Sequence, residues 1–197
     1  MILWSIQSMK AWKAAQKSKL LRCDRRFSQK LFAKAYAWMV KQMIKRLPVQ
    51  PFARRALPLW AWYQWEGEQR RKPDLRCRCH HFRGTRAVRI EFDMADNLVL
   101  LSDFDLWHYV LNYHYLPISA DDETYETKLA ELGLPDVPRR AGNHLVHRMI
   151  ETSWDRIFAL DWVEKDLALP RAKKSIQAVF WELPLQNVRR IDEFVAR

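Results

Sequence analysis

Residues 57–76 read L-P-L-W-A-W-Y-Q-W-E-G-E-Q-R-R-K-P-D-L-R, and this stretch predicts an aromatic strand that runs into a basic loop. Its first half is bulky and lies between Pro58 and Gly67, which is typical of a short β-strand. Side chains alternate along a strand, so one face would carry Trp60, Trp62 and Gln64. The other face would carry Ala61, Tyr63 and Trp65. Such a stretch can stack a flat ring and neutralise phosphate, or it can be core followed by a solvated loop.

The length and composition predict a single folded domain spanning residues 1–197. A hydrophobic content of 49% argues against disorder, and four glycines leave little material for a glycine-rich phosphate loop. No apolar run is long enough to span a bilayer, and the N-terminus does not resemble a signal peptide, so we expect no membrane association. The three cysteines are odd in number and predict a reducing, cytoplasmic location.

The positive charge is concentrated in the first half of the chain. Residues 1–90 contain 22 lysines and arginines and only four acids, a net charge of +18, whereas residues 91–197 carry −7. Aromatic residues lie between the basic ones, which favours a surface that binds a polyanion such as RNA or DNA. The alternative is an ordinary globular protein with a high isoelectric point.

Hydrophobic periodicity predicts an α+β fold, with five or six strands in two small sheets and helices packed around this core. Ser28 would cap one helix, and Ser102 with Asp105 resembles a capping box for another. After Pro184 we expect only a tail. We expect strands at residues 2–7, 87–93 and 175–183, and helices at residues 9–17 and 29–47.

Two groups of polar residues are candidates for a site. Cys77 to His81 read C-R-C-H-H, but zinc sites normally use a C-x-x-C spacing with a second pair, so we expect no metal. Glu151 lies one helical turn from Trp154 and from His147, where the pKa of a carboxylate can shift. The alternative, which we favour for Glu151 on its own, is an ordinary glutamate of a helix.

Several long motifs resemble a bacterial family of uncharacterised domains of about this size. The motifs are I-L-W-S-I-Q, A-Y-A-W-M-V-K-Q-M, W-A-W-Y followed by K-P-D-L-R, V-L-L-S-D-F-D-L-W-H-Y-V-L-N, S-W-D-R-I-F and I-Q-A-V-F-W. This resemblance covers nearly the whole chain and implies no activity.

The order of parts also resembles, more distantly, the ADP-ribosyltransferases of toxin–antitoxin systems that modify nucleic acids. The matching runs are L-W-S-I-Q, A-W-K-A-A-Q, S-K-L-L, W-A-W-Y-Q-W, Arg71-Lys72-Pro73, Gln177-Ala178-Val179 and V-R-R-I after Pro184. The resemblance implies an ADP-ribosyltransferase-like fold and NAD as a substrate. The chain departs from that family at Val179, where a catalytic glutamate would stand, and at Ser5 and Gln7, where a histidine is usual.

The resemblance implies a toxin or phage-defence effector that transfers ADP-ribose from NAD to RNA or DNA, with an antitoxin protein as a further partner. Glu151, Arg71 and Gln177 would then be catalytic, because a carboxylate or amide must stabilise the ribosyl cation as nicotinamide leaves. NAD would be held by Ser5, Gln7, Trp62, Trp65, Arg76 and Trp154. The alternatives are a non-catalytic nucleic-acid-binding module and a protein-interaction domain.

Overall fold

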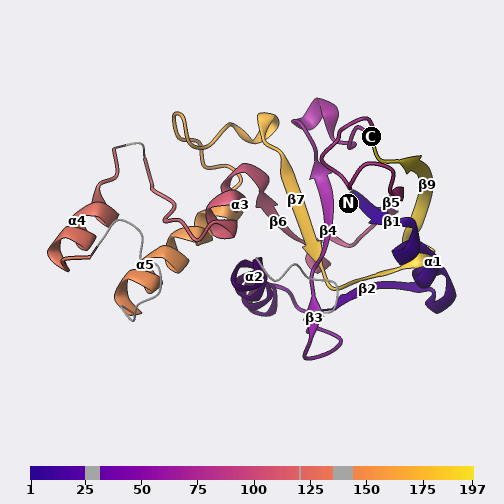
Figure 1. Ribbon diagram of the computed structural model, residues 1–197, viewed down its shortest axis with the longest axis horizontal. Coiled ribbons are helices and arrows are strands. Elements are labelled where there is room, and N and C mark those ends of the chain that lie inside the picture. The colour runs from indigo at the N-terminus through magenta and orange to yellow at the C-terminus, as the bar shows by residue number, and fades with distance from the viewer. Residues whose placement is uncertain (25–31, 120, 135–143) are drawn as a thin grey trace. The chain divides into compact units, whose positions relative to one another are not determined.

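The computed structural model describes residues 1–24, 32–119, 121–134 and 144–197, and these divide into two compact units (Figure 1). The first unit comprises Met1–Leu101 and Ser175–Arg197, and the second comprises Ser102–Lys174. The second unit is therefore inserted in sequence between two parts of the first. Whether the whole chain acts as one domain stays a prediction, and each unit is described by itself.

The structure mixes helices with two β-sheets, which confirms a mixed fold with a divided sheet. The larger sheet has the strand order β6-β7-β4-β1-β5-β9, and the smaller has the order β3-β2-β8. The larger sheet contains β1 (Ile2–Ser8), β4 (Leu59–Gln64), β5 (Arg86–Asp93), β6 (Leu100–Asp103), β7 (Ile176–Phe180) and β9 (Val188–Val195). The smaller sheet contains β2 (Leu20–Asp24), β3 (Ala56–Leu57) and β8 (Glu182–Pro184).

The described residues contain more strands than the five or six expected from the sequence. The main error concerns the chain after Pro184, where we expected a tail. Strand β9 instead pairs antiparallel with β5 along most of its length, with Ile90 opposite Ile191. Its alternation is weak because both faces carry charged residues, so periodicity alone did not reveal it.

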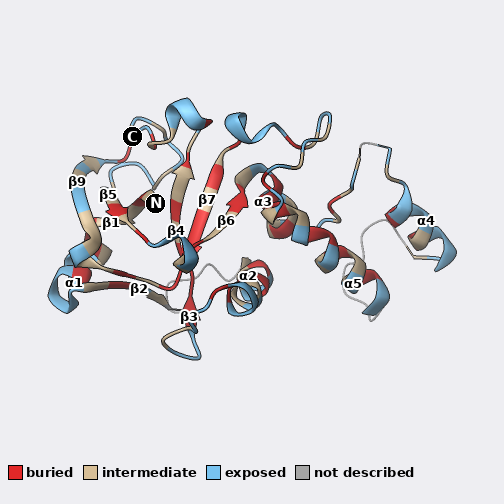
Figure 2. Ribbon diagram, turned by 180° about the vertical axis from the view of Figure 1, so that it is seen from behind, coloured by how far each residue is buried: buried red, intermediate tan, exposed pale blue. Residues whose placement is uncertain are grey.

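One face of the larger sheet forms the main apolar core of the first unit. Its strands contribute alternate residues, among them Leu3, Ala61, Ile90 and Phe180. Helix α1 (Met9–Ser18) covers this face, and the Ser8 hydroxyl caps it by accepting the backbone N–H of Ala11 at 3.2 Å. Buried residues line β4 and β7 in Figure 2.

Helix α2 (Ala33–Arg46) contacts β4 through a residue that points away from this core. The ring of Tyr36 lies edge-on to Trp60 at 5.9 Å, and Trp60 alternates with the core residue Ala61. The expected span of residues 29–47 agrees with α2 where the chain is described, and the predicted cap Ser28 lies outside the described residues.

The second unit contains the helices α3 (Phe104–Leu111), α4 (Thr124–Glu131) and α5 (His144–Ser153). The predicted capping box is wrong: Asp103, not Ser102, caps α3 and accepts the backbone N–H groups of Asp105 and Leu106. Ser102 is the third residue of β6 and is fully buried. None of the helices in the described ranges is long and apolar enough to cross a membrane.

Candidate functional site

A row of five side chains crosses the larger sheet on the face opposite the main core. The strand registers place Gln177 opposite Trp62, Trp62 opposite Trp4, Trp4 opposite Glu91, and Glu91 opposite Arg190. Directly opposed residues share a face, so the row joins β7, β4, β1, β5 and β9. The Trp4 indole N–H donates to Glu91 Oε2 at 2.9 Å, which fixes the central ring.

The basic loop after β4 folds back beside this row and encloses a cleft. The backbone N–H of Trp65 donates to the carbonyl of Arg71 at 3.1 Å, and Gly67 adopts a φ of 86°, which favours glycine. The Trp65 ring lies edge-on to Trp62 at 4.5 Å. The cleft has a volume of about 550 Å³ and is lined by Trp4, Trp65, Glu66, Glu68, Gln69, Arg70, Arg71, Lys72, Pro73, Asp74, Arg76 and Arg89.

Arg71 is held in the cleft by aromatic and backbone contacts instead of a carboxylate. Its guanidinium lies over the Tyr63 ring at 4.4 Å and 5.8 Å from the Trp4 ring, and Nε donates to the Tyr63 carbonyl at 3.1 Å. No carboxylate of the described ranges forms an ion pair with it. The terminal nitrogens of Arg71 are therefore available to an anion.

The neighbouring arginines of the loop are already neutralised. Arg70 forms an ion pair with Glu66 at 2.8 Å. Arg76 binds both carboxylate oxygens of Asp74, and this side-chain hydrogen bonding holds the pKa of Asp74 well below its usual range. Arg76, which we expected to hold phosphate, would have to exchange this carboxylate for a ligand.

The floor of the cleft is an ion-pair network. Lys72 Nζ lies 3.5 Å from Glu91 and 3.6 Å from Asp192, and Arg89 binds Asp192 at 2.7 Å. The Arg89 and Asp192 side chains are only 12% and 17% exposed. Burial raises the pKa of Asp192, but hydrogen bonds from Arg89 and Arg190 outweigh it and leave the pKa lower than usual. The network fixes the floor, and Arg71 is the cleft-lining cation for which the described residues show no ion pair.

Within the described residues, no hydrogen-bond partner is found for two buried atoms on this side of the sheet: Trp65 Nε1, which lines the cleft, and Gln177 Oε1, which belongs to β7 outside the cleft lining. Buried polar atoms are normally satisfied, and exceptions are commoner at functional sites. Gln177 shares the sheet face of Trp62. Val179, two residues along β7, is on the same face but is fully buried.

Ser5 and Gln7, predicted to contact NAD, belong to the opposite face of β1. The Ser5 hydroxyl is buried, donates to the Trp60 carbonyl at 2.8 Å and accepts from Gln7 Nε2 at 2.8 Å. These bonds support the β1–β4 pair within the sheet. A role in binding stays a prediction for both residues, and neither lines the cleft.

The other two predicted residues, Glu151 and Trp154, belong to the second unit. The Tyr113 hydroxyl lies 2.8 Å from His147 Nδ1 and donates to Glu151 Oε1 at 3.3 Å. Burial and the Glu151 charge raise the pKa of Tyr113 to about 12. Trp154 is almost completely buried, and its indole N–H donates to the His114 carbonyl at 2.7 Å.

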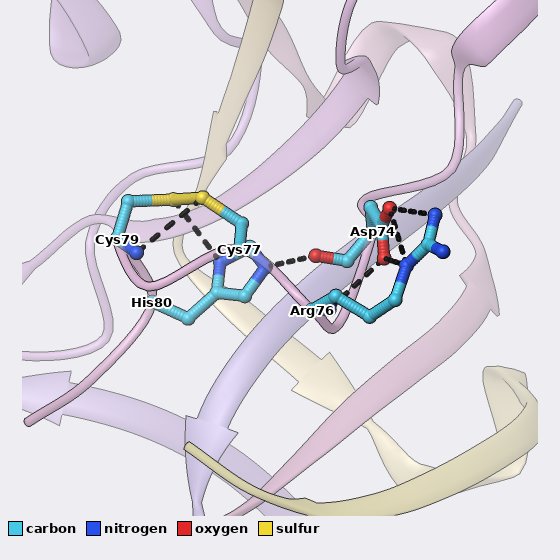
Figure 3. The surroundings of a disulfide bond; sticks show 5 residues. All are labelled: Asp74, Arg76, Cys77, Cys79 and His80. Carbon is cyan, nitrogen blue, oxygen red and sulfur yellow. Dashed lines mark hydrogen bonds and ion pairs between the residues drawn. A yellow bond between two sulfur atoms is a disulfide. The ribbon is translucent and has the colours of Figure 1, made fainter. Parts of the chain in front are cut away.

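The segment after the cleft contains a disulfide between Cys77 and Cys79, shown in Figure 3 beside Asp74, Arg76 and His80. From the C-x-C spacing in the sequence we expected no metal site, and we did not predict this disulfide. No group of three or more metal-binding side chains is found in the described ranges. His80 packs on Trp65 with ring centroids 5.1 Å apart, so this segment borders the cleft.

Sequence reasoning found the loop residues of the cleft but missed Trp4 and the ionic floor. Trp4 lies in the expected first strand. Its alternation with the core residue Leu3 could have placed it on the opposite face of the sheet, where the cleft is found. The partners Arg89 and Asp192 are 103 residues apart, and no local pattern relates them.

Residues 2–189 match the family described as a domain of unknown function, DUF3841, and the chain belongs to this family. This membership confirms the whole-chain resemblance to a family of uncharacterised domains. No curated protein and no solved structure is significantly similar to the chain.

Proposed function

We propose that the cleft between Trp65 and Arg71 binds a single strand of RNA or DNA, with a base against Trp65 and a phosphate on Arg71. The observation that carries this proposal is the state of Arg71. It is held over Tyr63 with no carboxylate partner among the described residues, in a cleft where Arg70 and Arg76 are each paired with a carboxylate. A guanidinium positioned in this way presents planar donors to a phosphate.

The composition of the unit around the cleft supports a polyanionic ligand. The net charge of +18 over residues 1–90 attracts phosphates before any specific contact forms. Stacking on an aromatic ring tolerates every base, so Trp65 needs no sequence-specific hydrogen bonds. The ion pairs around Arg71 keep the loop compact while one cation remains free.

A second candidate is ADP-ribosyl transfer from NAD to RNA or DNA, within an ADP-ribosyltransferase-like fold. The specific observation that favours it is the unpartnered amide oxygen of Gln177 on the face of Trp62. An amide oxygen there can stabilise the ribosyl cation, while Arg71 holds the pyrophosphate. Such an activity would suit a toxin or phage-defence effector whose antitoxin covers the cleft.

Binding is tested by fluorescence anisotropy with a labelled 12-nucleotide oligo(U) or oligo(dT) strand. We expect binding that weakens steeply with salt, because phosphate contacts release counterions. The variant Arg71→Ala should lose about tenfold in affinity, which is the effect of removing one charged hydrogen-bonding group. Arg22→Ala, which removes an exposed arginine of the same unit that is paired with Glu182, should change affinity less than twofold.

Equal losses for both variants, or binding that does not depend on salt, would contradict the proposal.

The second candidate is tested with NAD labelled in its adenylate part and the same strands. Transfer of label that is lost in Gln177→Ala supports catalysis. Oligonucleotide binding without transfer of label would support a non-catalytic nucleic-acid-binding module.

A further inference from the structure

The disulfide between Cys77 and Cys79 closes a ring across a single intervening residue, Arg78. Disulfides that stabilise a fold mainly do so by closing long loops, so a bridge of this separation contributes little to global stability. Cys79 is exposed, and Cys77 is half-buried. A reagent in solution can therefore reach the bond, which lies in the connection between β4 and β5 and outside both sheets.

His80 connects the disulfide to the cleft. Its Nδ1 lies 3.9 Å from Cys79 Sγ, and its Nε2 lies 2.8 Å from the carbonyl oxygen of Asp74 (Figure 3). A carbonyl only accepts, so Nε2 carries the hydrogen and Nδ1 of the neutral ring faces the sulfur with its lone pair. The same ring packs against Trp65 at 5.1 Å and Phe194 at 6.1 Å.

We propose that Cys77 and Cys79 form a redox-sensitive pair that controls the cleft through His80 and Trp65. In the closed state the disulfide holds His80 between Trp65 and the Asp74 carbonyl. In the open state the segment is released, and the wall of the cleft formed by Trp65 loses its support. The position of His80 makes the two states distinct, because it contacts both the sulfur and the wall.

The chemistry is thiol–disulfide exchange with a dithiol as the reductant. A thiolate of the dithiol attacks Cys77 Sγ, the bond to Cys79 breaks, and the Cys79 sulfur leaves with the electron pair and is protonated. The second thiolate of the reductant then attacks its own mixed disulfide and releases Cys77. Two electrons pass to the protein, the dithiol becomes a disulfide, and both cysteines end as thiols. In the reverse direction, Nδ1 of His80 accepts the proton of the Cys79 thiol. The resulting thiolate attacks the Cys77 sulfur of the mixed disulfide, and the sulfur of the dithiol leaves with the electron pair.

A reversible pair fits the compartment that the cysteine count predicts. In a reducing cytoplasm, disulfides are usually transient and serve catalysis or redox sensing. Pre-organised sites bind more tightly than sites that must be ordered on binding. We therefore expect the oxidised protein to bind the oligonucleotide at least threefold more tightly than the reduced protein. This expectation rests on the proposed function, whereas the release of the segment does not.

The first experiment compares the full chain after diamide oxidation and after dithiothreitol reduction. Alkylation followed by peptide mass analysis should find Cys77 and Cys79 disulfide-bonded and unlabelled in the oxidised sample, and both alkylated in the reduced sample. Hydrogen exchange of peptides covering residues 65–84 should accelerate at least threefold on reduction, whereas peptides of β5 stay unchanged. Oligonucleotide affinity is measured on the same two samples.

Three variants complete the experiment. Cys77→Ser with Cys79→Ser should match the reduced protein under both conditions, and Cys23→Ser, which removes the cysteine outside the bond, should keep the full response. His80→Gln should slow re-oxidation, because it removes the base beside Cys79. Labelling of both thiols after oxidation, or equal exchange of residues 65–84 in both states, would overturn the switch. A normal exchange response without any oligonucleotide binding would instead overturn only the proposed function.

Discussion

Lys174 Nζ lies 2.7 Å from Asp103 Oδ2, and the two side chains are only 1% and 3% exposed. Asp103 and Lys174 stand near the two ends of the second unit, which comprises Ser102–Lys174. The other carboxylate oxygen of Asp103 caps α3 by accepting the backbone N–H of Asp105 at 3.0 Å. The Asp103 carboxylate therefore caps the first helix of the unit and also forms an ion pair with Lys174, the last residue of the unit.

Removing Lys174 should destabilise the protein strongly, because it leaves a buried carboxylate without its counter-charge. We expect Lys174→Met to lower the free energy of unfolding by about 3–5 kcal/mol in urea denaturation. The double variant with Asp103→Asn should lose less than the sum of the single changes, because asparagine keeps the cap. As a control, Arg171→Ala, at the exposed ion pair with Asp161, should cost less than about 1 kcal/mol. A similar small loss for Lys174→Met would contradict this role.

Trp65 and Arg71 should affect nucleic-acid binding in different ways. Trp65→Ala should cost about 1–3 kcal/mol of binding free energy and leave the salt dependence unchanged, because it removes stacking. Arg71→Ala should also reduce the slope of log K against log salt by about 0.7, because it removes one phosphate contact to a single strand. Trp65→Phe is the matched control and should retain most of the affinity. Anisotropy titrations at several salt concentrations measure both quantities, and identical slopes for the alanine variants would refute the division of roles.

The elements that could be predicted are those whose information is local. The alternation in residues 87–93 gave β5, and the apolar spacing of residues 9–17 gave α1. The capping box failed because Ser102 and Asp103 are both residue types that cap helices well, and the residue that caps α3 is Asp103, which also pairs with the buried Lys174. The basic run before β7 likewise gave no sign that Lys174 is buried.

The site could be predicted only in part, because it depends on strand register. The sequence pointed to Trp62, Trp65 and Arg71, which are close along the chain. It could not bring Gln177 opposite Trp62 or Glu91 opposite Trp4, since these pairs form only when distant strands align. The predicted grouping of Arg71 and Gln177 with Glu151, which belongs to the second unit, stays a prediction.

Asp192 should stabilise the protein at neutral pH and lose this effect in acid. Its folded-state pKa lies below the unfolded value of about 3.9, so its contribution is present above that value and disappears as pH falls through the folded pKa. Asp192→Asn should therefore cost about 1–3 kcal/mol at pH 7, and the difference should shrink below about pH 4. Urea denaturation from pH 3 to 7 measures this, with Asp93→Asn at the exposed pair with Arg189 as a control that should cost less than about 1 kcal/mol. A loss at Asp192 that is independent of pH would assign its effect to packing.

Gln177 gives a test that separates a ligand-binding role from a structural one. Its buried Oε1 has no hydrogen-bond partner in the part of the chain that the structure describes, so replacing the amide by an apolar side chain of similar length removes an unsatisfied group. We expect Gln177→Met to leave the free energy of unfolding unchanged or to raise it by about 1 kcal/mol. If the oxygen serves a ligand, the same variant should lose oligonucleotide affinity or NAD-dependent label transfer while its stability is preserved. Gln64→Met is the comparison, because Gln64 is a buried glutamine of the adjacent strand that lies opposite Ile176, beyond a register shift that removes it from the face of Trp62 predicted by alternation. We expect it to destabilise the protein without a selective effect on binding. A destabilising Gln177→Met with unchanged binding would show that this amide supports the sheet and that the cleft does not extend to β7.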